Sequence, residues 1–111
     1  MDLTTRRCVP CDAGTPPLDA AAQAALLPQV PGWAARDRRL HRTFTFRDFV
    51  EAMRFVNRIA EVAEAEAHHP DFTVHYNEVT VVIWTHTIGG LSENDFVLAA
   101  KIGAVEREEK K

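Results

Sequence analysis

The chain has 111 residues, of which 46% are hydrophobic and 26% are charged, and its formal net charge at pH 7 is −3. This composition is ordinary for one globular domain, and the acidic balance provides no basic surface for nucleic acid. The apolar runs are too short to span a bilayer, and the first seven residues lack the apolar stretch of a signal peptide, so we expect a cytoplasmic location without a membrane anchor.

The first 17 residues are expected to form an extended N-terminal leader, because three prolines and a glycine lie between positions 10 and 17. The leader contains both cysteines, Cys8 and Cys11. A Cys-x-x-Cys pair can be a redox motif or half of a zinc site, but a zinc site needs further ligands and the sequence has no second such pair. We expect two reduced thiols. Metal binding together with a histidine is the less favoured alternative.

A short helix should follow the leader, with Asp19 as its N-cap and an apolar stripe that ends before Pro28. Two strands are expected within residues 33–46. In the second of them Leu40 and Phe44 share one face, because successive side chains of a strand point to opposite sides.

A long helix is expected over residues 48–67. Asp48 with Glu51 three positions later matches a capping box, and apolar side chains recur every three or four positions, which is typical of one buried helical face. Pro70 disfavours helical geometry at the residue before it. The pair His68–His69 is therefore predicted at the C-terminus of this helix.

Residues 72–76 and 79–86 are expected to form a hairpin joined through Asn77–Glu78, with His86 at the end of its second strand. Ser92 should cap a last helix, and the charged tail 106–111 should fray.

The expected order is helix, two strands, helix, two strands, helix. Short connections between paired strands favour an α+β fold in which helices cover one antiparallel sheet. We therefore expect a single domain over residues 18–105, between the leader 1–17 and the charged tail.

Three histidines and two carboxylates suggest proton-transfer chemistry. His68 and His69 are adjacent, and His86 lies 18 residues after the first of them. Imidazole can give and take protons at neutral pH because its ordinary pKa lies near 7. Glu64 lies one helical turn before His68 and is placed to orient it or to raise its pKa. Asp95 follows at the start of the last helix.

Each of these residues also has a structural interpretation. A single histidine is more often a surface residue than a catalyst, and Glu64 fits a solvated helix position. Ser92-x-x-Asp95 matches a capping pair, which is compatible with catalysis if the start of the helix forms a wall of the cleft. His41 and His75 are interpreted as structural or surface residues.

Metal catalysis is the rival chemistry for three histidines. Adjacent His68 and His69 lack the His-x-x-x-His spacing that puts two ligands on one helical face, so acid–base chemistry is favoured. Nucleophilic catalysis has little support, because the sequence contains no Gly-x-Ser-x-Gly motif. We expect no metal and no cofactor.

The spaced residues Glu64-x-x-x-His68-His69-Pro70-x5-Tyr76-x9-His86-x8-Asp95 resemble the signature of the pterin-4a-carbinolamine dehydratases. Flanking segments resemble the family as well: Gly32-Trp33, Phe44-x-Phe46-x-Asp48-Phe49 and Gly90-Leu91-Ser92. The resemblance extends from about residue 18 to residue 103.

This resemblance implies a four-stranded antiparallel sheet with three helices on one face, and a homodimer or homotetramer. It implies dehydration of a 4a-hydroxytetrahydropterin, which recycles the tetrahydropterin used by aromatic amino acid hydroxylases. His68 and His86 would be acid and base, and His69 would mainly bind substrate. Glu64 and Asp95 would orient imidazoles or bind the pterin. Trp33 is interpreted equally well as a wall of the site or as a core residue.

One position departs from the resemblance, because Asn94 stands where some members carry an arginine. The family also includes partner-binding proteins. The alternative function is therefore a non-catalytic binding module, a dimerisation cofactor or assembly factor, on the same fold.

Overall fold

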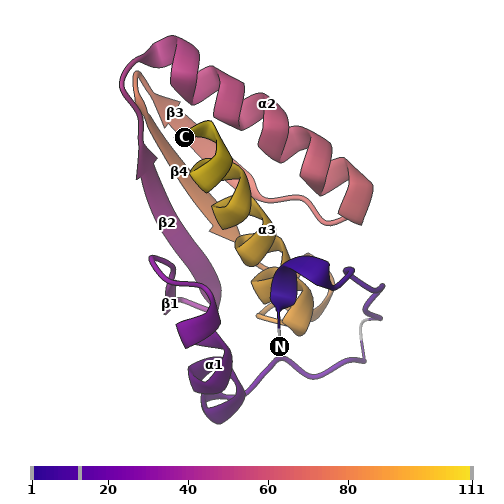
Figure 1. Cartoon of the computed structure of the whole chain (residues 1–111). Helices are drawn as coiled ribbons and strands as arrows, with labels where there is room; N and C mark the ends of the chain where they lie inside the picture. The colour runs from indigo at the N-terminus through magenta and orange to yellow at the C-terminus, as the bar shows by residue number, and fades with distance from the viewer. Residues whose placement is uncertain (1, 13, 111) are drawn as a thin grey trace.

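The structure is a computed structural model that describes residues 2–12 and 14–110 (Figure 1). Four strands form one antiparallel sheet in the order β1-β2-β4-β3. Their bounds are Ala34–Arg36 for β1, Arg39–Thr45 for β2, Asp71–His75 for β3 and Glu78–Ile83 for β4. The predicted antiparallel sheet is therefore confirmed.

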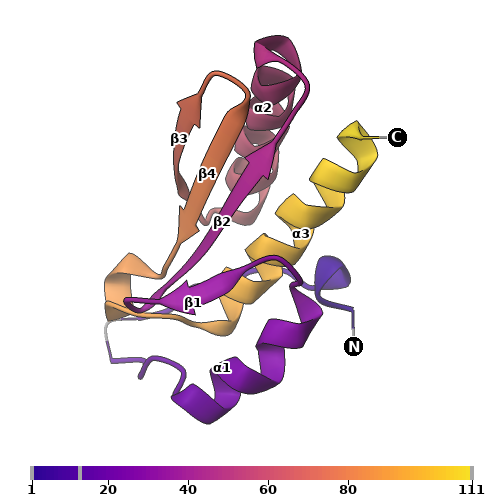
Figure 2. The same ribbon diagram turned by 90° about the vertical axis from the view of Figure 1, so that its left-hand side faces the viewer.

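Three α-helices accompany the sheet: α1 at Ala20–Leu26, α2 at Phe49–Glu66 and α3 at Glu93–Glu109. Figure 2 shows α2 and α3 together on one face of the sheet, while α1 lies at the β1 end of the molecule. Three short 3₁₀ helices are η1 at Leu3–Thr5, η2 at Leu27–Gln29 and η3 at His86–Ile88. The α+β class and the order of the elements agree with the sequence prediction. No helix in residues 2–12 and 14–110 is both long and apolar enough to cross a membrane.

The core lies between the sheet and helices α2 and α3. Alternation in β2 buries Leu40 and Phe44, and alternation in β4 buries every second residue from Val79 to Ile83. Phe55 of α2 and Phe96 of α3 are fully buried against this surface. Burying one large apolar side chain contributes about 1.5–3 kcal/mol, so this layer dominates the stability of the fold and fixes both helices on the sheet.

Two predicted boundaries were wrong. Strand β4 ends at Ile83, so His86 is not at a strand end and instead opens η3. The hairpin turn is formed by Tyr76 and Asn77, one residue earlier than predicted, and Tyr76 takes up a left-handed backbone conformation with φ of 55°.

The charged tail is not frayed over its first part, because α3 continues to Glu109. The guanidinium of Arg58 in α2 pairs with Glu108 at 2.5 Å and with Glu109 at 3.2 Å. These contacts hold the end of α3 against α2 and explain why this fully charged segment stays helical. Lys111 lies outside the described residues.

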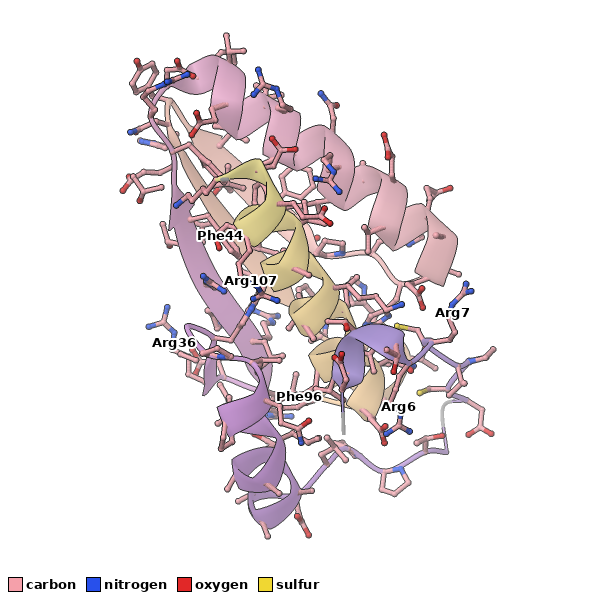
Figure 3. All side chains as sticks on the ribbon, in the orientation of Figure 1. Arg6, Arg7, Arg36, Phe44, Phe96 and Arg107 are labelled. Atoms are coloured by element: carbon pink, nitrogen blue, oxygen red, sulfur yellow. The ribbon has the colours of Figure 1, made fainter. Side chains whose placement is uncertain are left out.

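The leader packs against the rest of the chain. Leu3 in η1 is 2% exposed and belongs to the same core as the sheet residues. Figure 3 shows Arg6 and Arg7 on the leader near the start of α3 and the C-terminal end of α2. Arg6 pairs with Glu93 at 2.5 Å, and Arg7 donates to the carbonyl of Ala65 at 2.9 Å. The leader is thus joined to both helices.

Candidate active site

The C-terminus of α2 positions the adjacent histidines. Ala67 ends the helix in a left-handed conformation with φ of 53°, and its N–H still bonds to carbonyls of the last turn. This geometry turns the chain away from the helix axis at His68. Pro70 follows two residues later, where a helix cannot readily continue. The predicted location of both histidines at the helix end is confirmed.

His68 is joined to Asp95, which lies 27 residues further along the chain. Its Nε2 lies 2.6 Å from Asp95 Oδ1. The Asp95 side chain is fully buried, and that of His68 is 14% exposed. A buried carboxylate that accepts from Nε2 selects the tautomer with a proton there, which leaves Nδ1 as the proton acceptor of the neutral ring. The carboxylate also stabilises positive charge on that ring when it takes up a proton.

The second oxygen of Asp95 is held by its own surroundings. Oδ2 accepts from the backbone N–H of Ser92 at 2.8 Å and from the hydroxyl of Thr85 at 2.9 Å. The Thr85 and Ser92 hydroxyls lie 2.7 Å apart. The predicted capping role of Asp95 is therefore confirmed, and the same carboxylate also reaches His68. Sequence reasoning missed Thr85, whose only signal is its position beside the loop that precedes Ser92.

His86 approaches the same region from η3. Its ring stacks on Trp84, with centroids 4.1 Å apart and an interplanar angle of 20°. Trp84 has a second ring contact, because the guanidinium carbon of Arg39 lies 4.2 Å from its ring centroid. The stacking of Trp84 on His86 was not predicted from the sequence.

A cavity of about 300 Å³ brings the three histidines together. Its lining consists of Ala67, His68, His69, Trp84, Thr85, His86 and Thr87. Two of the histidines come from the end of α2 and one from η3, so the fold unites residues that are distant in sequence. A pocket with three imidazoles and a buried carboxylate behind one of them can transfer protons to and from a bound molecule.

Glu64 contacts a different histidine from the one predicted. Its Oε2 lies 2.5 Å from Nε2 of His69, and both side chains are more than half exposed. The left-handed residue Ala67 breaks the regular helical spacing, so the four-residue separation of Glu64 and His68 does not bring them together. An exposed pair of this kind contributes at most about 1 kcal/mol.

Trp33 lies in the core and does not line the histidine cavity. It is 7% exposed and packs edge-on against Phe44, with ring centroids 5.9 Å apart. It borders a separate cavity together with Val30, Arg42 and Gly103. Of its two interpretations, the structure supports the core residue.

A second cavity, of about 280 Å³, is also lined by His68. The leader residues Cys8 to Cys11 line it, together with Glu66, Ala67, His68, Thr85, Thr87 and Asn94. The side-chain amide of Asn94 accepts from the Val9 N–H at 2.8 Å and donates to the Val9 carbonyl at 2.5 Å. Asn94 therefore binds the leader, a role that sequence reasoning missed.

Both cysteines are free thiols. Burial, reinforced by the nearby carboxylate of Glu66, raises the pKa of Cys8 to about 12, so this thiol stays protonated at neutral pH. Within residues 2–12 and 14–110, no three His, Cys, Asp or Glu side chains are grouped so that they could hold a metal ion. The alternative of a metal bound by the cysteines and a histidine gains no support from this arrangement.

Comparison with known proteins agrees with the fold. The family model described as pterin 4 alpha carbinolamine dehydratase matches residues 16–105. The chain is 50% identical to a protein of Dechloromonas aromatica over 91% of this chain and 90% of that protein. It is 50% identical to one of Halorhodospira halophila over 95% of this chain and 98% of that protein. The names of both relatives refer to this dehydratase.

A crystal structure described as a transcriptional coactivator/pterin dehydratase from Brucella melitensis has the same fold. Its TM-score is 0.77 and its sequence identity is 33%, with 80% of this chain and 97% of that chain covered. The chain therefore belongs to the pterin 4 alpha carbinolamine dehydratase family.

Proposed function

We propose that this protein is a hydro-lyase that dehydrates a 4a-hydroxytetrahydropterin to the quinonoid dihydropterin and water. The observation that carries the proposal is the pair His68–Asp95, which borders a cavity that also contains His69 and His86. Membership of the family supplies the substrate class. In this role the protein recycles the tetrahydropterin of aromatic amino acid hydroxylases.

The reaction needs one acid and one base. Hydroxide is a poor leaving group, so the acid protonates the 4a-hydroxyl as the C–O bond breaks and water leaves. The base removes the proton from N5, and that electron pair forms the C=N bond between N5 and C4a. We assign these two roles to His68 and His86. Each contributes about 10²–10⁴-fold to the rate.

The remaining site residues are assigned to positioning and binding. Asp95 is a positioning residue, because its buried carboxylate fixes the His68 ring. His69 borders the same cavity and is assigned to substrate binding, with Glu64 bonded to its Nε2. The pterin is the substrate. The proposed chemistry requires no cofactor, because the protein only donates a proton to the substrate and accepts one from it.

A homodimer or homotetramer in the cytoplasm completes the proposal. Strand β3 pairs with β4 alone in the described part of the chain, which leaves the outer backbone groups of β3 open to a second strand. Gel filtration with light scattering gives the mass of the assembly directly. A monomer at micromolar concentration would contradict this part of the proposal.

The activity test generates the 4a-carbinolamine in situ with an aromatic amino acid hydroxylase and follows its ultraviolet decay. Acceleration by the wild type that is lost in His68→Ala is the expected result. His75→Ala is the matched control, because His75 is an exposed histidine of β3. No acceleration by the folded wild type would overturn the proposal and favour the alternative of a non-catalytic partner-binding module.

A further inference from the structure

The leader is fixed against the domain by buried polar side chains. Glu66 is 8% exposed and Asn94 is 7% exposed. Glu66 Oε1 accepts from the N–H of Cys8 at 2.8 Å, and Asn94 bonds to both backbone groups of Val9. Lys101 and Arg7 in turn pair with the other oxygen of Glu66, at 3.0 and 2.9 Å. These bonds define the backbone position at Cys8 and Val9.

The leader is also fixed at its far end. The N–H of Leu18 donates to the carbonyl of Leu91 at 2.8 Å. Gly90 lies so close to Pro17 that a Cβ on Gly90 would come within 2.9 Å of that ring. The leader thus crosses the loop that precedes α3, and that loop is adjacent to Thr85 and Asp95 of the site.

His68 lines both the leader cavity and the histidine cavity. The cavity of about 300 Å³ with His69 and His86 and the cavity of about 280 Å³ with the leader share four lining residues, Ala67, His68, Thr85 and Thr87. A substrate whose reacting atom lies at His68 is therefore close to the leader residues that line the adjacent cavity.

We propose that the leader segment Cys8–Cys11 is a wall of the substrate site, and that the cavity beside it receives the substituent on C6 of the pterin. This inference rests on the proposed function. C4a and C6 are both bonded to N5, so a substrate with C4a at His68 must place its C6 substituent within a few bond lengths of the same side chain. The leader cavity is lined by His68 and shares Thr85 and Thr87 with the histidine cavity, so it is adjacent to that position.

The lining of the leader cavity selects a short uncharged substituent with hydroxyl groups. Val9 and Pro10 give an apolar surface, and Thr87 gives a hydroxyl at the rim shared with the histidine cavity. The charges of Glu66 are already paired with Lys101 and Arg7. A phosphorylated substituent would find no uncommitted cation among the residues that line this cavity in the described structure.

The test compares two carbinolamines that differ at C6, one with a dihydroxypropyl group and one with a methyl group. Cys11→Phe fills part of the cavity from the leader side, and Cys11 itself makes only long sulfur contacts, 3.4 Å to Asn94 Nδ2 and 3.9 Å to the Val9 carbonyl. The variant should lower kcat/KM about tenfold or more for the dihydroxypropyl substrate and about threefold or less for the methyl substrate. Val50→Trp, which adds bulk at an exposed position of α2 that lines neither cavity, should change neither.

Val9→Trp is a second blocking variant, because Val9 is 63% exposed and a larger side chain there disturbs no core packing. A midpoint of thermal unfolding equal to that of the wild type verifies that both variants are folded. Equal losses for the two substrates, or no loss for either, would overturn the inference.

A binding measurement separates this inference from the proposed function. Calorimetric titration with the two 7,8-dihydropterins that carry the same C6 groups requires no turnover. Weakened binding of the dihydroxypropyl compound alone in Cys11→Phe supports the cavity assignment even if the wild type fails to accelerate dehydration. Failure of the proposed function would appear only in the rate assay.

Discussion

The buried carboxylate of Asp95 joins His68 to the first turn of α3. One of its oxygens lies 2.6 Å from His68 Nε2, while the other accepts from the N–H of Ser92 and the hydroxyl of Thr85. The position of the imidazole is therefore set by the start of a helix that belongs to the core. A rigid helix positions a side chain more accurately than a surface loop does.

Asp95→Asn should lower kcat for the dehydration by about 10²–10⁴-fold. The amide that replaces the carboxylate carries no charge to stabilise a protonated His68, and its NH₂ group can force the imidazole into the other tautomer. Stopped-flow decay of the carbinolamine gives kcat, and a urea titration gives the free energy of unfolding. KM should change by no more than about threefold.

The control for this prediction is Thr85→Val, which removes one bond to Asp95 and keeps the charge. It should cost about 1–2 kcal/mol of stability and lower kcat much less than Asp95→Asn does. If the two variants lose equal activity, the effect comes from disturbed packing around Asp95, and its proposed role in orienting His68 is wrong.

Glu64→Gln should lower kcat/KM by about threefold or less. The Glu64–His69 pair is exposed on both sides, with side-chain exposures of 79% and 59%, so solvent screens its charges. The same rate assay measures this, and the matched comparison is Asp95→Asn, in which a buried carboxylate is lost. A loss as large as that of Asp95→Asn would restore to Glu64 the orienting role that its sequence spacing suggested.

Trp84→Ala should lower kcat/KM by about 3- to 10-fold, while Trp84→Phe should retain most of the activity. The stacked pair of Trp84 and His86 restricts the orientation of that histidine, and aromatic pairs contribute about 0.5–1.5 kcal/mol beyond their buried area. Trp33→Phe is the control, because Trp33 borders a different cavity. Greater loss of activity in Trp33→Phe than in Trp84→Ala, with both variants folded, would contradict this assignment.

The sequence predicted the elements of the fold because their signals are local. Asp48 accepts from the N–H of Glu51 at 2.9 Å, and Asp19 accepts from that of Ala22 at 2.8 Å, as their capping positions indicated. The boundary at His86 was missed for an equally local reason. Trp84 and His86 continue the alternation of β4, but η3 begins where the strand pattern would have continued.

The contacts across the site could be predicted only in part. Family resemblance indicated that His68, His86 and Asp95 belong together, but the partner of Glu64 depended on one left-handed residue, Ala67, which helical spacing does not reveal. The docking of the leader depends on Asn94 and Glu66, which lie 85 and 58 residues from their leader partners. Hydrogen bonds over such separations leave no periodic pattern in a sequence.

Acid should weaken the fold partly through Glu66. Burial alone would raise the pKa of its carboxyl, but bonds from the Cys8 N–H, Lys101 and Arg7 outweigh burial and hold the pKa below its ordinary value of 4.5. A carboxyl whose pKa is lower in the folded than in the unfolded protein stabilises the fold. The contribution is complete at pH values above the unfolded-state pKa, and it is lost as pH falls through the folded-state pKa.

Glu66→Gln should therefore unfold more easily at pH 7, by about 1–3 kcal/mol, because Lys101 and the leader lose a charged partner. The difference from the wild type should shrink as pH falls below about 4.5, where the wild-type carboxylate itself becomes protonated. Urea unfolding between pH 3 and pH 7 measures both free energies. Glu61→Gln is a matched control on the exposed face of α2 and should follow the wild type throughout. A difference between Glu66→Gln and the wild type that stays constant over this range would show that the ionised carboxylate of Glu66 does not stabilise the folded protein.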